Sequence, residues 1–354
     1  MKTSWKEEYL NAEGKRENGS PEAEELFFDN IAGQIREVVK HFEEDNHGTK
    51  RRGNHAKILA GFTHAQFKIL PLTVDTKDLS VGFIQPGRTY DAILRLSNAS
   101  GESNDDDSKP DLRGIALRIN TDDGLQDFLM TNAEPHHARD AREAMIAIRA
   151  GVMKDIIADV IPDFFPGEEG LSGALGALPY MVGHMGLGGF RMASTLKKQM
   201  KLKVESLATE TFWSRAPIAI GLNTTPGQAI ALKFRLRPTL YKKAQTQISP
   251  AKNLEEELMQ RLQNNDIFYL FEVQFYQDET TTPIEDSTVS WPTPFYPIAE
   301  LKIPKGSINE KDVVDQLNFS PWNVDAQHFR PLGSMNRSRK KVYTAGVHER
   351  TSKE

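Results

Sequence analysis

Tyr343 is the residue of this chain whose neighbours point most directly to chemistry. It lies four residues after Arg339 and seven residues before Arg350, and on an α-helix these three positions share one face. A phenol with a pKa near ~10 is a poor ligand while protonated, but adjacent positive charge favours the phenolate. A phenolate is one of the few axial ligands that proteins give to haem iron. The alternative for this spacing is an amphipathic basic helix with a half-buried tyrosine.

A second group with chemical potential lies near the other end of the chain. The sequence RGNHAK at residues 52–57 contains Arg52 and His55 and opens an apolar run that reaches residue 72. A neutral imidazole can take a proton from one oxygen of a peroxide and return it to the other. The alternative for an isolated histidine in such a run is a structural residue of the core.

Further short motifs lie between these two groups. They are RLS at 95–97, DLRG at 111–114, DFLMTN at 127–132, WP at 291–292, YPIAE at 296–300 and FSP at 319–321. This ordered set, from residue 52 to residue 350, resembles the haem catalase superfamily. The frame is most similar to the compact catalase-related peroxidases, a branch related to catalase-like allene oxide synthases. Large catalases continue beyond this point into a C-terminal helical region that carries a nucleotide site, so the resemblance implies that this region and bound NADPH are missing.

The resemblance implies haem b as the cofactor and gives each matching residue a role. Tyr343 would be the proximal ligand of the iron, and His55 would be the distal acid and base. Ser97 would fix the tautomer of the His55 ring, and Asn132 would donate a hydrogen bond to the bound peroxide. The basic residues that would hold the cofactor are Arg52, Arg95 and Arg350 at the propionates and Arg339 beside the phenol.

The sequence departs from the family pattern near the proposed distal side. Thr131 stands in place of the first asparagine of a paired motif, and Asn54 stands where large catalases usually have valine. His136 and His137 replace two phenylalanines that would line the approach to the iron. These two histidines would make that approach more polar.

The resemblance implies a haem-dependent peroxidase with weak catalase activity. Such an enzyme would reduce hydrogen peroxide or small organic hydroperoxides through a ferryl intermediate, with electrons from an organic donor. An alternative is a fatty-acid hydroperoxide isomerase or lyase similar to allene oxide synthases, which needs no donor. The apolar segment 166–193 favours the alternative, since it could accept a lipid, whereas His136 and His137 suit small peroxides. A third reading is a haem sensor or carrier without turnover, against which His55 and Asn132 argue.

Composition excludes several other kinds of site and partner. The chain of 354 residues contains no cysteine, which rules out disulfides, zinc–thiolate sites, iron–sulfur clusters and cysteine nucleophiles. A formal net charge of −5 gives no support to a nucleic-acid partner. No apolar stretch reaches the length of a membrane span, and the N-terminus lacks the apolar core of a secretory signal. We therefore expect a cytoplasmic protein, and we expect it to form a homodimer.

The hydrophobic pattern predicts an α+β fold, in which an eight-stranded antiparallel β-barrel is surrounded by helices. Residues 1–50 would form an N-terminal arm and a helix that begins at Ser20-Pro21, and residues 51–354 would form the haem-binding barrel domain. The predicted strands are 55–72, 89–96, 114–120, 128–132, 218–222, 229–236, 268–276 and 296–302. Helices are predicted at 140–160, around 254–262 and at the C-terminal end, and 166–193 is predicted to be a flexible, partly buried insertion.

Overall fold

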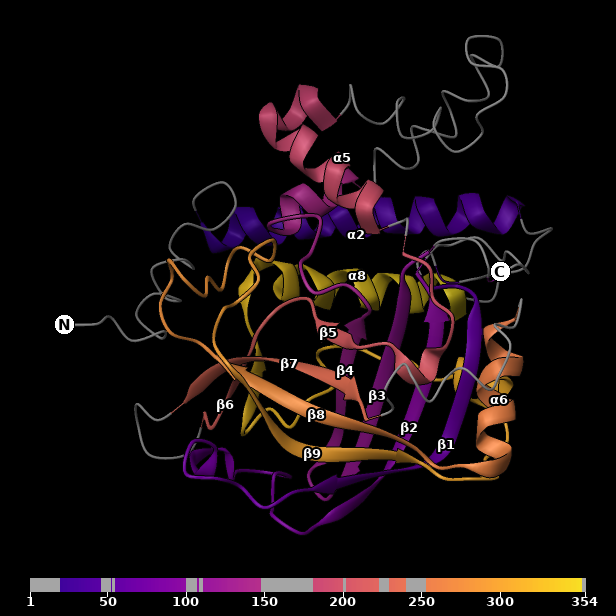
Figure 1. The fold of residues 1–354 in the computed structure, drawn as a ribbon. Helices are drawn as coiled ribbons and strands as arrows, with labels where there is room; N and C mark the ends of the chain where they lie inside the picture. The colour runs from indigo at the N-terminus through magenta and orange to yellow at the C-terminus, as the bar shows by residue number, and fades with distance from the viewer. Residues whose placement is uncertain are drawn as a thin grey trace.

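Eight antiparallel strands close into a barrel at the centre of the molecule (Figure 1). They are β1 (Ile58–Ile69), β2 (Thr89–Asn98), β3 (Arg113–Thr121), β4 (Gly124–Thr131), β5 (Phe212–Ser214), β7 (Ile230–Pro238), β8 (Ile267–Phe275) and β9 (Phe295–Ile303). The strand order is β7-β5-β4-β3-β2-β1-β9-β8, and β7 also pairs with β8, which closes the ring. The predicted α+β fold with an eight-stranded antiparallel barrel is confirmed.

The computed structural model describes residues 20–45, 52, 55–99, 107, 111–147, 181–199, 202–222, 229–239 and 253–351. The predicted polar arm at 1–19 lies outside these residues. The helix predicted at 140–160 is present at 141–147, and the rest of that prediction also lies outside them.

One predicted strand is not part of the ring. β6 (Ile218–Ile220) pairs with β7 and with β10 (Phe329–Pro331), and together they extend the sheet outside the barrel. The strand that closes the barrel is β5, which joins β4 to β7. β5 spans only three residues, which is too short to show an alternating hydrophobic pattern, so it could not be predicted.

Phenylalanine side chains fill the barrel interior. The ring centroids of Phe128 lie 4.9 Å from those of both Phe234 and Phe271, and the Phe67 centroid lies 5.4 Å from that of Phe271. These four side chains are almost fully buried. Side chains alternate along a strand, so the other face of each strand points out of the barrel. A ligand site therefore has to form against the outer face.

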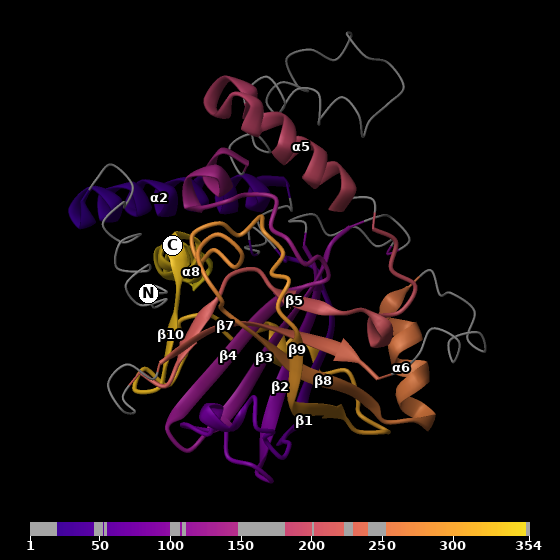
Figure 2. The same cartoon turned by 60° about the vertical axis from the view of Figure 1, so that its left-hand side comes forward.

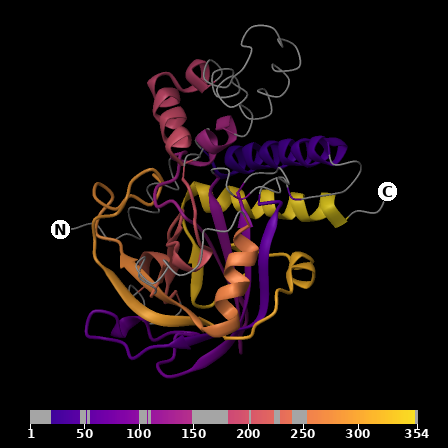
Figure 3. The same ribbon diagram turned by 45° about the vertical axis from the view of Figure 1, so that its right-hand side comes forward.

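Helix α8 (Gly333–Thr351) covers part of that outer face, and helix α2 (Pro21–Asp45) lies over α8 (Figures 1 and 3). The start of α2 agrees with the predicted one, and its Ser20 Oγ accepts a hydrogen bond from Ala23 N at 3.1 Å. Arg337 of α8 ties the two helices together, since its Nε lies 2.8 Å from a carboxylate oxygen of Glu24. Its Nη1 lies 2.9 Å from Glu285. The helix that carries Tyr343 is thus anchored from two sides.

The remaining helices lie at the periphery. They are α5 (Leu187–Gln199), α6 (Leu254–Asn264), the short α7 (Lys311–Asp315), and the 3₁₀ turns η2 (Lys77–Leu79) and η3 (Leu207–Thr209). Figure 2 shows α5 beyond α2 as seen from the barrel. Of the insertion predicted at 166–193, residues 181–193 are helical apart from Gly186 and are partly buried as predicted, while 166–180 lie outside the described residues. Among the described helices, none is both long and apolar enough to cross a membrane. The proposed domain boundary at residue 50 stays a prediction.

Candidate active site

A cavity of about 210 Å³ lies between helix α8 and the outer face of strands β2, β3 and β4. Strand alternation builds its floor, because Leu94 and Leu96 pack into the barrel core while Arg95 and Ser97 line the cavity. Seven of the eight predicted site residues line it: Arg52, His55, Arg95, Ser97, Arg339, Tyr343 and Arg350. The barrel and α8 thus bring the two ends of the motif series together.

The backbone of His55 is held in an unusual conformation. Its φ angle is 56°, in the left-handed region that residues with a side chain rarely adopt. Two hydrogen bonds hold it there: His55 N donates to Ala99 O at 3.0 Å, and Arg95 Nη2 donates to His55 O at 2.8 Å. The predicted partner of the ring is also in place, since His55 Nδ1 lies 3.1 Å from Ser97 Oγ.

Gly114 leaves the space in which the His55 ring lies. A β-carbon at position 114 would lie 2.5 Å from Cε1 and 2.6 Å from Nδ1 of His55, well inside van der Waals contact. The sequence motif contained this glycine, but only the structure shows that it supports the imidazole.

The environment of His55 favours the neutral imidazole. Burial lowers its pKa to about 3, and the nearby charges of Arg95, Arg339 and Arg215 act in the same direction. His55 is half-buried and lines the cavity. The ring is therefore neutral at physiological pH, and one ring nitrogen is able to accept a proton.

The opposite wall of the cavity carries the predicted phenol and its arginine. Arg339 Nη2 donates a hydrogen bond to the Tyr343 hydroxyl oxygen at 3.0 Å, as the spacing of four residues on a helix predicts. The second arm of the guanidinium, Nη1, donates to Asn336 Oδ1 at 3.2 Å, which fixes its orientation. The phenol oxygen thus has a cationic donor, an arrangement that suits an anionic oxygen ligand.

Three arginines gather at one edge of the cavity around a single carboxylate. Asp315, at the end of α7, forms ion pairs with Arg52 and with Arg95, the latter at 3.0 Å. Arg350 donates to the side-chain oxygen of Asn318. Burial, and then the positive charge of Arg52, lowers the pKa of Arg95 and of Arg350 to about 10. Asp315 belongs to none of the sequence motifs, so its place in the site could not be predicted.

These residues fit haem. Three cations facing one carboxylate leave charge for further carboxylates, which haem supplies as its two propionates. The phenol of Tyr343 offers an oxygen ligand on the wall opposite His55. Within the described residues, no three His, Asp or Glu side chains converge on one point as a separate metal site.

Asn132 is the one predicted site residue outside the cavity lining. Its Oδ1 accepts a hydrogen bond from Arg113 N at 2.7 Å, and its Nδ2 donates to Glu210 Oε2 at 3.2 Å. The neighbouring Thr131 lines the cavity instead. Arg215, which belongs to none of the sequence motifs, lines it as well. The role of Asn132 as a hydrogen-bond donor to bound peroxide stays a prediction. The hydrogen bonds that its side chain makes in this structure do not favour that role.

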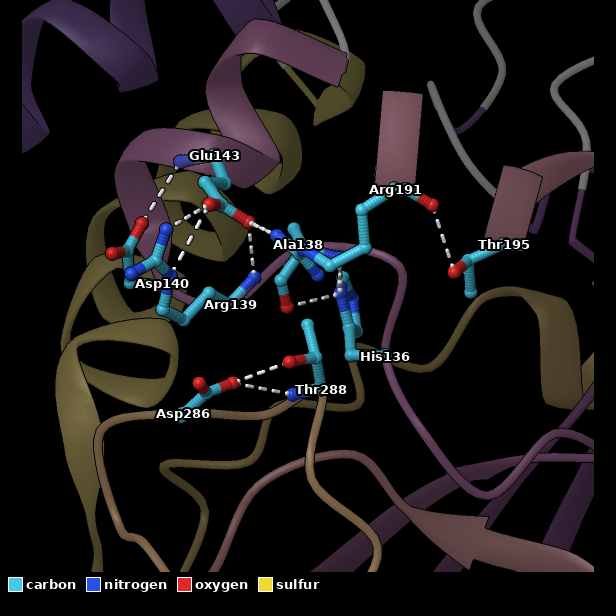
Figure 4. A network of polar contacts seen from close by, with 9 residues as sticks. All are labelled: His136, Ala138, Arg139, Asp140, Glu143, Arg191, Thr195, Asp286 and Thr288. Atoms are coloured by element: carbon cyan, nitrogen blue, oxygen red, sulfur yellow. Dashed lines mark hydrogen bonds and ion pairs between the residues drawn. The ribbon is translucent and has the colours of Figure 1, made fainter. Parts of the chain in front are cut away.

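His136 and His137 lie in a well-anchored turn after β4. Their ring centroids are 4.2 Å apart, and His136 Nδ1 accepts a hydrogen bond from Ala138 N at 2.9 Å. Next to them Glu143 forms ion pairs with Arg139 and Arg191 (Figure 4). Burial lowers the pKa of His137 to about 3 and that of His136 well below its ordinary value. Neither histidine is part of the cavity lining, so their placement on an approach path stays a prediction.

The first part of the chain matches a known family. The protein-family model for catalase matches residues 26–155, which include most of α2, His55 and strands β1 to β4. This part of the chain is therefore similar to the catalases. No curated protein is similar enough in sequence to count as a match.

Solved catalases share the fold of this chain. A bacterial catalase is 17% identical with a TM-score of 0.62, and the match covers 88% of this chain and 59% of that one. A fungal catalase is 15% identical with a TM-score of 0.59, covering 87% and 61% of the two chains. Catalase A from Saccharomyces cerevisiae is 16% identical with a TM-score of 0.59, covering 89% and 63%. The chain therefore spans about three fifths of the length of these three catalases.

Proposed function

We propose that this chain is a member of the catalase superfamily and works as a haem-dependent peroxidase with weak catalase activity. It reduces hydrogen peroxide or small organic hydroperoxides with electrons from an organic donor. The observation that carries the proposal is the pairing of two walls of one cavity. One wall holds a neutral His55 that is hydrogen-bonded to Ser97. The other wall holds Tyr343, which is hydrogen-bonded to Arg339.

Each residue that lines the cavity would have a separate role in this reaction. Haem iron, when bound, supplies the redox chemistry that breaks the O–O bond. Tyr343 would ligate the iron, and the arginines at positions 52, 95 and 350 would bind the propionates. His55 would accept the proton of the incoming hydroperoxide and return it to the departing oxygen, and Ser97 would keep the ring in one tautomer.

The test compares substrates with and without a donor. The haem-loaded protein is mixed with hydrogen peroxide, with cumene hydroperoxide and with a polyunsaturated fatty-acid hydroperoxide, each in the presence and absence of a phenol. A peroxidase takes two electrons from outside, so we expect alcohol or water as product and turnover that rises with phenol concentration. Protein that binds no haem, or that turns over none of these peroxides, would contradict the proposal.

The same test separates the second candidate, a fatty-acid hydroperoxide isomerase or lyase. The observation that favours it is the apolar part of the cavity lining, which consists of Ile35, Ile115, Leu129, Met130, Phe319, Val342 and Val347. An isomerase returns the electrons to its own substrate, so rapid conversion of the lipid hydroperoxide without phenol would favour it. Dimerisation and a cytoplasmic location stay predictions of the sequence.

A further inference from the structure

Arg215 enters the cavity because of the strand that closes the barrel. The β4–β5 register pairs Thr131 with Trp213 and Met130 with Ser214. Arg215 follows directly after β5, so its side chain lies beside the end of β4 and lines the cavity with Thr131. Both residues belong to the same cavity as His55.

Neutral groups alone accept the hydrogen bonds of the Arg215 guanidinium. Its Nη1 donates to Thr131 Oγ1 at 2.7 Å and to Ala133 O at 3.1 Å, and its Nη2 donates to Gln199 Oε1 at 3.5 Å. Its Nε is buried and has no hydrogen-bond partner among the residues that the structure describes. In the described parts of the chain no carboxylate pairs with this arginine, and the residue is only 8% exposed.

Two other buried arginines of this chain are paired with carboxylates. Arg118 forms two hydrogen bonds to the carboxylate of Asp127, at 2.7 and 2.8 Å, and Arg261 forms an ion pair with Glu257. A buried charge without a counter-ion is costly, and proteins normally pair it. Burial and the charge of Arg339 lower the pKa of Arg215 only to about 9, so it stays mostly charged at neutral pH. A buried, charged and unpaired arginine in a cavity is suited to an anion from outside.

We propose that Arg215 and Thr131 form a carboxylate-binding subsite in this cavity, which makes small peroxycarboxylic acids a preferred class of substrate. This inference rests on the proposed function for the reaction but not for the binding of carboxylates. Arg215 offers a planar set of donors that matches a carboxylate, and the Thr131 hydroxyl lies next to it.

The chemistry of peroxycarboxylic acids explains the preference. Cleavage of their O–O bond releases a carboxylate, whereas a simple hydroperoxide releases an alkoxide that needs a proton. Overall, one peroxycarboxylic acid, two electrons and two protons give one carboxylic acid and one water, and the phenolic donor is oxidised by two electrons. Negative charge develops on the departing carboxylate as the bond breaks, so Arg215 would bind the transition state more tightly than the neutral substrate.

The first test uses acetate, the product of peroxyacetic acid, as the probe. Isothermal titration calorimetry measures acetate binding to the purified protein, with haem and without it. We expect Arg215→Met to weaken binding about 10- to 100-fold, the usual effect of losing a charged hydrogen bond. Arg88→Met is the matched control, because Arg88 is exposed, pairs with Asp122 and lies outside the cavity lining. Acetate that does not bind, or that binds the parent and Arg215→Met equally, would overturn the subsite.

The second test measures selectivity with haem-loaded protein. We expect Arg215→Met to lower kcat/KM for peroxyacetic acid at least tenfold more than kcat/KM for tert-butyl hydroperoxide, which releases no carboxylate. An equal loss for both substrates would overturn the substrate preference. If Arg215→Met does not fold, Arg215→Lys and Thr131→Val replace it, and both must still weaken acetate binding relative to Arg88→Met. Haem-free protein that binds acetate through Arg215 would support the subsite even if the peroxidase proposal failed.

Discussion

The imidazole of His55 rests against the backbone of Gly114, with no room for a methyl group between them. His55 takes a left-handed backbone conformation at the start of the barrel, and Gly114 lies at the start of a strand two places away in the sheet. The position of the ring therefore depends on a residue that has no side chain.

Gly114→Ala should disable the distal wall while leaving the barrel folded. The new methyl group would collide with Cε1 and Nδ1 of His55, so the ring must leave its place beside Ser97. Loss of a positioned base typically slows a reaction about 10²–10⁴-fold. Stopped-flow mixing of the haem-loaded variant with peroxide measures the rate. The control is Gly183→Ala, since a β-carbon there meets nothing within 4 Å.

His55→Ala should slow the reaction with peroxide more than Ser97→Ala does. We expect His55→Ala to slow the reaction with peroxide by about 10²–10⁴-fold without loss of haem, because it removes the proton acceptor. Ser97→Ala removes only the hydrogen bond to Nδ1 and should cost less. A His55→Ala variant as fast as the parent would remove His55 from the proposed role. Ser307→Ala, which removes a hydroxyl bonded to Pro304 O, controls for the loss of a serine.

Tyr343→Phe should abolish or alter haem ligation without unfolding the chain. The substitution removes one hydroxyl group, which accepts its hydrogen bond from Arg339. The haem content and the absorption spectrum of the purified protein report the change. Tyr296→Phe is the matched control, because Tyr296 is also half-buried but lies outside the cavity. If the spectrum and haem content of Tyr343→Phe equal those of the parent, another residue holds the iron.

The free energy of unfolding should fall as the pH drops below about 6.5. His55 and His137 have a pKa of about 3 in the folded protein, and that of His136 is also depressed, against an ordinary value of 6.5. Between these values the unfolded chain binds protons that the folded chain does not, so the stability present above pH 6.5 is lost toward pH 3. Each such histidine contributes up to about 1.4 kcal/mol per pH unit.

Urea unfolding of the haem-free protein at pH 7 and at pH 5 tests this acid sensitivity. His137→Phe removes one of the three histidines that bind a proton on unfolding. The pH dependence of the free energy of unfolding should therefore become less steep by about one third of the histidine contribution. An identical pH dependence in His137→Phe and the parent would contradict the assignment.

Much of the fold and of the site could be predicted from the sequence, because local patterns determine it. Alternation along β2 placed Arg95 and Ser97 on one face, and helical spacing placed Arg339 beside Tyr343. The motif order then indicated that these segments meet.

Other parts of the site depend on contacts between distant segments that leave no pattern in the sequence. Arg215 reaches the cavity only because the three-residue strand β5 closes the barrel, and Asp315 meets Arg52 and Arg95 only because α7 packs against β1 and β2. Asn132 and Thr131 are adjacent in the chain, so which of the two faces the cavity depends on strand register, which the motif alone did not fix.

The order in which the walls of the cavity are synthesised has a consequence for assembly. His55, Gly114, Thr131 and Arg215 all leave the ribosome before α8 exists, and chains begin to fold from their N-terminal side. Until α8 docks, the arginines and the apolar floor of the cavity are open to water, and the clamp of Arg337 on Glu24 and Glu285 cannot form. Capture of a cofactor would then be a late event in the assembly of the protein.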